Sequence, residues 1–92
     1  MTRVFLSKRW LKSLSKLNAD QRTKAEAVLR DLVETFGKPH LHAGIGVRKL
    51  APDYYECRVD LRWRILLYHC GDKLLAYEVM SHDEVRAFLR GR

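Results

Sequence analysis

The sequence lacks any apolar run of about 20 residues, the length that a helix needs to cross the hydrocarbon core of a membrane. The opening ten residues, MTRVFLSKRW, also contain too short an apolar segment to resemble a signal peptide. These two absences exclude a membrane span and a secretory leader from the interpretation. We therefore expect a cytoplasmic protein.

Cysteine is scarce, and the two that occur, Cys57 and Cys70, do not form a C-x-x-C pair. In the cytosol such cysteines are expected to be reduced thiols rather than a disulfide. The histidines show no spacing typical of metal ligands; they are His40, His42, His69 and His82. We expect neither a metal nor another cofactor.

The sequence also lacks internal repeats, low-complexity segments and the composition shifts that mark linkers. Its 92 residues suffice for one modest hydrophobic core. Gly44 and Gly46 lie in a loop over residues 40–46, but neither their spacing nor the preceding residues fit a dinucleotide-binding loop. We predict one domain over residues 1–92.

Acidic residues are in deficit, with 11 Asp and Glu against 18 Lys and Arg. The resulting net charge of +7 on so small a protein favours a polyanionic partner, such as nucleic acid, an acidic protein or an anionic membrane surface. Charge alone does not choose among these partners.

The most informative stretch runs from Tyr54 to His82 and reads as three consecutive antiparallel strands. Branched and aromatic residues dominate it, and two short polar breaks divide it. The predicted strands are Tyr54–Asp60, Trp63–Cys70 and Leu74–Met80. The segment Cys70–Lys73 is a good tight turn, because Gly71 tolerates a positive φ.

Side chains alternate between the two faces of a strand, which assigns each residue to a face. One predicted face is apolar enough to be buried; it carries Tyr55, Cys57, Val59, Trp63, Ile65 and Leu67. The other is expected to remain accessible; it carries Tyr54, Glu56, Arg58, Arg62, Arg64, Leu66 and Tyr68. Arginines on such a face either bind phosphate through two parallel hydrogen bonds of the guanidinium or are simply solvated.

The segments around these strands predict further elements. Arg3–Leu6 is a short strand, and Ser7 caps a helix whose apolar residues are Trp10, Leu11, Leu14 and Leu17. A second helix over residues 20–36 ends at Gly37, with Pro39 just beyond, so that the two helices form an antiparallel hairpin.

A fourth strand of the sheet is predicted at Val47–Leu50, and Ser81 with Glu84 forms a capping box that opens a final helix. The order β-α-α-β-β-β-β-α predicts an α+β fold in which the helical hairpin packs on a mostly antiparallel sheet. We expect one core between the hairpin and the sheet, formed by Trp10, Leu14, Val28, Leu32, Ile65 and Leu67.

Several segments of this sheet resemble one known family. The basic strand VRKL at 47–50 precedes YECR at 55–58, which is similar to that family's E-L-R segment. WRILLY at 63–68 resembles its Y-R-[IVL]-[VIL]-Y strand, and VMSHDE at 79–84 closes the sheet. In this order and spacing the motifs resemble the RelE/ParE superfamily of toxins from toxin–antitoxin pairs, over essentially the whole chain.

The resemblance implies a RelE-like fold and, in the ribonuclease branch, metal-independent cleavage of mRNA on the ribosome. A second branch shares the fold but inhibits DNA gyrase without the nuclease residues, and a non-toxic adaptor is a third alternative. In either toxin branch the implied partner is a small acidic antitoxin that covers the basic face of the sheet.

The resemblance assigns the candidate catalytic residues, of which Arg64 is the first because it matches the family's Y-R arginine. Arg58 shares its face, either as a second phosphate-binding cation or as a surface partner of Glu56 or Asp60. Glu56 is either the base that accepts the 2′-hydroxyl proton or an orienting partner of the arginines.

His82 falls where several members carry a histidine, so it is either the acid that protonates the leaving oxygen or only the first residue of a capped helix. Many nucleases of the family carry a tyrosine near the start of the last helix, where this sequence reads Val85–Phe88, and Phe88 is assigned to the core. The residues expected to bind RNA are Arg48, Lys49, Arg62 and Tyr68.

Overall fold

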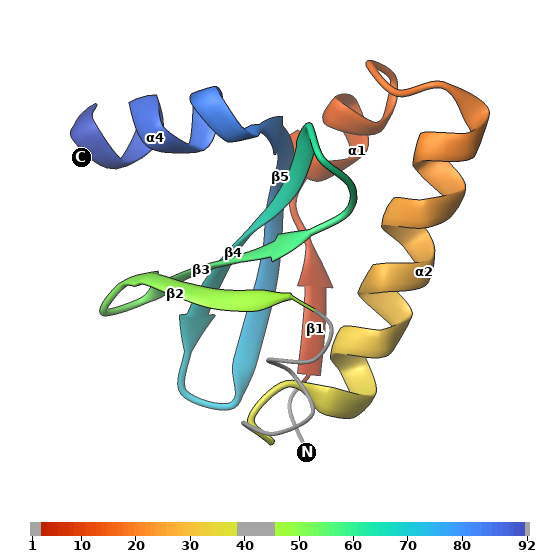
Figure 1. The fold of residues 1–92 in the computed structure, drawn as a ribbon. Coiled ribbons are helices and arrows are strands. Elements are labelled where there is room, and N and C mark those ends of the chain that lie inside the picture. The colour runs from red at the N-terminus through yellow and green to blue at the C-terminus, as the bar shows by residue number, and fades with distance from the viewer. Residues whose placement is uncertain (1–2, 39–45, 92) are drawn as a thin grey trace.

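We describe residues 3–38 and 46–91 of a computed structural model of the chain (Figure 1). The elements follow the predicted order β-α-α-β-β-β-β-α. Their bounds are β1 Arg3–Leu6, α1 Lys8–Leu14, α2 Ala19–Thr35, β2 Val47–Ala51, β3 Tyr54–Arg58, β4 Trp63–Cys70, β5 Lys73–Ser81 and α4 His82–Gly91. The α+β prediction is confirmed, and the predicted strand boundaries lie within two residues of the observed ones. The first helix is shorter than predicted, because α1 ends at Leu14, three residues before Leu17.

The five strands form one sheet in the order β1-β5-β4-β3-β2. Every neighbouring pair is antiparallel except β1 and β5, which run parallel. The helices α1 and α2 connect β1, at one edge of the sheet, to β2 at the other edge. Figure 1 shows α1 and α2 on one side of the sheet and α4 projecting on the other.

The two helices of the hairpin begin at capped residues. The Ser7 side chain accepts a hydrogen bond from the Trp10 backbone N–H at 3.0 Å. Asn18 caps α2 in a capping box with Gln21, so the helix starts one residue before the predicted Asp20. After α2, Gly37 adopts φ +91°, the left-handed conformation that ends many helices.

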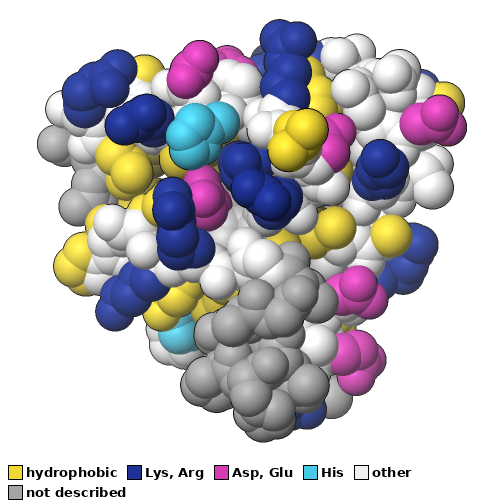
Figure 2. Space-filling model, viewed as in Figure 1, with side chains coloured by type: hydrophobic (Ala, Val, Ile, Leu, Met, Phe, Trp, Pro, Cys, Tyr) yellow, Lys and Arg dark blue, Asp and Glu magenta, His cyan; other side chains and the backbone are white. Residues whose placement is uncertain are grey.

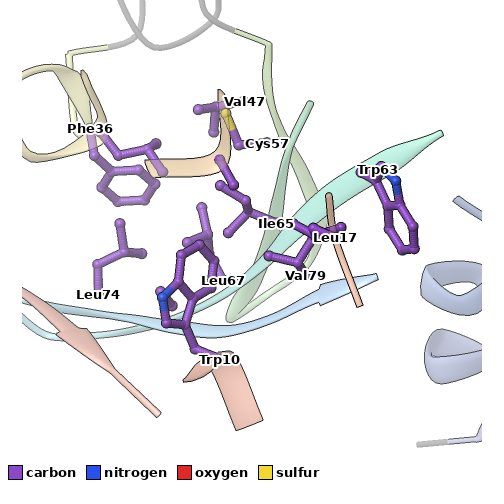
Figure 3. Close-up of a cluster of buried hydrophobic side chains, with 13 residues drawn as sticks. Trp10, Leu17, Phe36, Val47, Cys57, Trp63, Ile65, Leu67, Leu74 and Val79 are labelled. Carbon is purple, nitrogen blue, oxygen red and sulfur yellow. The ribbon is translucent and has the colours of Figure 1, made fainter. Parts of the chain in front are cut away.

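The main core lies between the helical hairpin and the sheet, as predicted. Trp10, Leu32, Ile65 and Leu67 are fully buried in it, and Leu14 and Val28 pack against it. Figure 3 shows Trp10 reaching from α1 toward Leu67 and Val79 of the sheet. The strand register assigned from alternation is therefore correct, since a shift of one residue would have turned Ile65 outward.

The second face of the sheet is not fully open, contrary to expectation. Leu66, Met80 and Val85 form a small second core there, and α4 covers it; residues packed around it are Leu50, Tyr54, Tyr77, Phe88 and Leu89. Phe88 stacks on Tyr77 with ring centroids 5.8 Å apart, which agrees with its assignment to the core. This face is thus divided into a part under α4 and a part beside it.

No helix in the described ranges, 3–38 and 46–91, has both the length and the apolar content to cross a membrane. Within the same ranges, no group of three His, Cys, Asp or Glu side chains is arranged to hold a metal ion. The loop predicted at residues 40–46, with His40 and His42, lies outside the described residues except for Gly46.

Candidate active site

A cleft of about 380 Å³ opens beside α4 on the second face of the sheet. Its lining contains all four predicted catalytic residues and one predicted RNA-binding residue; the full lining is Gly46, Val47, Arg48, Glu56, Arg58, Arg64 and His82. Figure 2 shows the same face, where Lys and Arg side chains gather around a histidine and an acidic side chain. The structure therefore brings together residues from β2, β3, β4 and α4.

Strand pairing explains why these residues meet. Arg48 lies opposite Glu56 on neighbouring strands, and Arg58 lies opposite Arg64. Residues directly opposite each other point to the same face of a sheet, so the alternation in sequence becomes a cluster in space. His82 joins them because it follows β5 immediately, and its backbone N–H donates to the Arg62 carbonyl at 3.0 Å.

Glu56 is the acidic centre of the cleft and is only 5% exposed. Its Oε2 lies 3.1 Å from Nη2 of Arg48 and 4.0 Å from Nε of Arg64. Its Oε1 is buried and accepts no hydrogen bond from the described residues. One carboxylate oxygen is thus compensated by cations, while the other is buried without a hydrogen-bond partner among the described residues.

Arg64 is 7% exposed, so it is not the solvated surface arginine that the alternation pattern also allowed. Its Nη1 donates to the backbone carbonyls of Asp60, Leu61 and Trp63, at 2.5, 3.3 and 3.1 Å. These bonds fix the plane of the guanidinium before any ligand arrives. A cation held in this way is suited to stabilise charge that develops at one defined point.

Arg58 is exposed, and within the described residues it forms neither of the ion pairs with Glu56 or Asp60 that the sequence allowed. Its backbone N–H donates to the Gly46 carbonyl at 3.3 Å. Gly46 has φ +90°, and a Cβ added there would lie 3.3 Å from Cβ of Arg58. Glycine at this position therefore gives Arg58 room at the edge of the cleft.

His82 fits both interpretations that the sequence left open. Ser81 and Glu84 form the predicted capping box, with backbone-to-side-chain distances of 2.9 and 3.1 Å, so His82 is the first residue of a capped helix. Its side chain also lines the cleft, where Nδ1 is buried and has no hydrogen-bond partner among the described residues. The cap orients the backbone and leaves the imidazole available.

A family model that describes a ParE-like toxin domain matches residues 19–85. The chain belongs to this family. The match covers both the long helix α2 and the strands that form the cleft, and it confirms the resemblance to the RelE/ParE superfamily. No curated protein sequence is similar enough to count as a match.

Solved toxin structures have the same fold. A chain of the RelB–RelE antitoxin–toxin complex from Methanococcus jannaschii superposes with a TM-score of 0.71 at 16% identity, over 91% of this chain and 96% of that one. The E. coli DinJ–YafQ complex gives 0.67 at 15%, over 92% and 98%. The YoeB/ParE toxin from Agrobacterium tumefaciens gives 0.68 at 16%, over 88% and 99%.

The remaining predicted RNA-binding residues of this ParE-like toxin lie outside the cleft. Lys49 pairs with Tyr55 and so belongs to the opposite face. The Arg62 guanidinium lies 4.9 Å from the centre of the Trp63 ring, on the side of Glu84, whose pKa it helps to lower. Tyr68 lines a separate apolar groove with Phe5 and Leu75.

Cys57 is buried beneath the cleft floor and is not a nucleophile. Burial raises the pKa of its thiol to about 12, and the charges of Asp31 and Glu56 contribute in the same direction. Such a thiol stays protonated at neutral pH, which agrees with its predicted role in packing.

Proposed function

We propose that this ParE-like toxin is a metal-independent endoribonuclease that cleaves mRNA on the ribosome. The observation that carries the proposal is the cleft in which Glu56, Arg58, Arg64 and His82 converge. It contains a carboxylate, two guanidinium groups and an imidazole, the groups that cleavage by a ribose 2′-hydroxyl requires. The RelE and YafQ chains with the same fold support this assignment.

In the proposed reaction the Glu56 carboxylate takes the proton from the 2′-hydroxyl. The 2′-oxygen then forms a bond to the adjacent phosphorus, and the bond from phosphorus to the 5′-oxygen breaks. Arg64 and Arg58 stabilise the negative charge that grows on the non-bridging oxygens. His82 gives a proton to the leaving 5′-oxygen, so the products are a 2′,3′-cyclic phosphate and a 5′-hydroxyl.

We further propose that an acidic antitoxin binds this toxin and covers the basic cleft. The net charge of +7 favours such a partner by electrostatic attraction. Two of the similar structures, the RelB–RelE and DinJ–YafQ complexes, contain a toxin together with its antitoxin.

Inhibition of DNA gyrase is the competing function, because the matching family model is named for ParE-like toxins. A gyrase inhibitor acts by binding, so it does not need the carboxylate, the guanidinium and the imidazole together. It would arrest growth with DNA-damage signalling, and changes at Glu56 or His82 would leave that arrest unaltered.

The deciding experiment is induced expression followed by mapping of mRNA ends, for the wild type and for Glu56→Gln, Arg64→Ala and His82→Ala. We expect new 5′ ends within translated messages for the wild type and few or none for the three variants. His82→Ala should reduce cleavage more than Phe88→Tyr, because Phe88 packs against Tyr77 outside the cleft. A melting curve for each variant separates lost chemistry from lost folding.

An Arg64→Ala protein that is folded at the assay temperature and still cleaves messages would rule out the ribonuclease assignment. Growth arrest without any new mRNA ends, together with induction of the DNA-damage response, would favour gyrase as the target. A free protein that neither arrests growth nor cleaves RNA would favour the adaptor.

A further inference from the structure

The turn between β3 and β4 holds two of the cleft residues at once. Oδ1 of Asp60 accepts hydrogen bonds from the backbone N–H groups of Arg62 and Trp63, at 2.9 and 2.8 Å. This local bonding folds residues 60–62 into a tight loop, as short acidic side chains do in turns. The Asp60 side chain bonds to N–H groups, so the backbone carbonyls of residues 60–62 remain to accept other hydrogen bonds.

Those carbonyl groups bind the catalytic residues. The carbonyls of Asp60 and Leu61 accept from Nη1 of Arg64. The next carbonyl, that of Arg62, accepts from the His82 backbone N–H at 3.0 Å. Three consecutive carbonyls therefore fix a guanidinium on β4 and the first residue of α4.

The bonds at Nη1 also decide which edge of Arg64 faces a substrate. Nη1 is occupied by the turn, and Nε points toward Glu56 at 4.0 Å. Within the described residues Nη2 has no hydrogen-bond partner, and Arg64 lines the cleft. The guanidinium thus offers its Nη2 edge to an anion in the cleft.

We propose that Asp60 is a positioning residue of this site, which sets the Arg64 guanidinium and the start of α4 by fixing the 60–62 turn. The inference rests on the proposed function, because it assigns a role in that reaction. Asp60 does not line the cleft and does not touch the reacting atoms. Both hydrogen bonds of the Asp60 carboxylate go to neutral backbone N–H groups. The proposal therefore requires a side-chain acceptor at position 60 but not a negative charge.

The test compares Asp60→Ala, which removes the acceptor, with Asp60→Asn, whose amide oxygen accepts the same two bonds without a charge. Asp72→Ala is the matched control, because it removes an acidic residue from the β4–β5 turn, where the Asp72 carboxylate forms an exposed ion pair with Arg3. All three variants raise the net charge by one, so unspecific attraction to RNA changes equally. Two readouts are needed: single-turnover cleavage of mRNA on programmed ribosomes, and the ¹⁵N signals of the Arg64 guanidinium in the free protein.

We expect Asp60→Ala to lower the cleavage rate at saturating ribosome about 10- to 100-fold, the cost of a displaced catalytic group, with ribosome binding unchanged. The Nη1 and Nη2 signals of Arg64, separate in the wild type, should merge as the guanidinium begins to rotate. Asp60→Asn should retain most of the rate and both signals, and Asp72→Ala should behave as the wild type does.

Asp60→Ala with a wild-type rate and unmerged signals would overturn the proposal. Asp60→Asn as slow as Arg64→Ala would also overturn it, and this comparison remains decisive if Asp60→Ala does not fold. The NMR readout does not depend on cleavage. If the wild type itself cleaves no RNA, the proposed function fails, while merged signals in Asp60→Ala still show that Asp60 positions Arg64.

Discussion

At the scale of single residues, Arg64 and Glu56 are two charged side chains buried inside a small protein. Both side chains are almost inaccessible, and each is compensated by more than one contact. Burying a charge is costly unless it is paired and hydrogen-bonded, so the pair contributes to stability only while both partners are present. Arg58, at the same cleft but exposed, carries no such constraint.

This contrast predicts different results for the two arginines. Arg64→Ala should lower the cleavage rate about 10²- to 10³-fold, the usual cost of one transition-state donor. It should also lower the free energy of unfolding by up to about 3 kcal/mol, because it leaves three carbonyls and part of the Glu56 charge uncompensated. Arg58→Ala should lower the cleavage rate with little change in stability. Urea denaturation and single-turnover cleavage measure the two effects, and equal stability losses for both variants would contradict the argument.

The two thiols should differ in reactivity. In the native protein an aromatic disulfide reagent should modify the exposed Cys70 rapidly and Cys57 only on unfolding, because burial protects Cys57 and raises its pKa to about 12. A thiol with a raised folded-state pKa stabilises the fold below its unfolded pKa, and this contribution is lost as pH rises toward the folded value. The melting temperature of the wild type should therefore fall between about pH 9 and 12, and that of Cys57→Ala should fall less steeply over the same range. The comparison uses the slope with pH, because the cavity left by the substitution lowers the melting temperature of the variant at every pH.

Alternation alone placed Glu56, Arg58 and Arg64 on one face, because they lie within regular strands. It failed for Arg62, because that residue lies in the 60–62 turn, where the period of two does not hold, and its side chain lies over Trp63. The role of Asp60 was not predicted either, because an aspartate between two strands indicates a turn and says nothing about which carbonyls the turn presents.

At the scale of elements, α4 decides the shape of the cleft. Its apolar side covers Leu66 and Met80, and its first residue, His82, forms one wall. In the sequence, Val85, Phe88 and Leu89 recur at helical spacing in this helix, and Leu66 is a lone aliphatic residue on the second face of β4. Those two signals together could have indicated that α4 packs on the second face of the sheet.

The capping box of α4 should matter for both stability and activity. Ser81→Ala should lower the free energy of unfolding by about 0.5–2 kcal/mol, the typical cost of losing a helix cap, and should reduce cleavage by loosening His82. Ser15→Ala is the control, since the hydroxyl of that exposed serine donates to the Lys12 carbonyl and caps no helix N-terminus. Thermal denaturation and single-turnover cleavage of both variants provide the comparison, and an Ser81→Ala protein as stable as the control would contradict this role.

The same cap has a pH dependence. The hydrogen bond from the Ser81 backbone lowers the pKa of Glu84 below its ordinary value of 4.5, and Lys16 acts in the same direction. A lowered folded-state pKa gives a contribution that is present above the unfolded value and is lost as pH falls. The stability difference between the wild type and Glu84→Gln should therefore be larger at pH 7 than at pH 3, as measured by urea denaturation.

At the scale of the whole molecule, the net charge of +7 bears on the proposed binding of RNA. If RNA enters the cleft as proposed, the basic side chains around it would neutralise phosphates and release counterions on binding. We expect the affinity for a single-stranded RNA to fall steeply between about 50 and 200 mM salt, by an amount that grows with the number of phosphates contacted. Arg48→Ala should make this dependence less steep. Fluorescence anisotropy measures both, and an affinity that is insensitive to salt would exclude an electrostatic mode.

The parallel pairing of β1 with β5 has a consequence for the order of events during synthesis. Residues 3–6 leave the ribosome early, but their only neighbours in the sheet are residues 73–76. His82 follows later still, so a nascent chain holds neither a closed sheet nor a complete cleft until α4 has emerged. Under the proposed function, the chain therefore cannot act on RNA before residues 82–91 have been made and have folded onto the sheet.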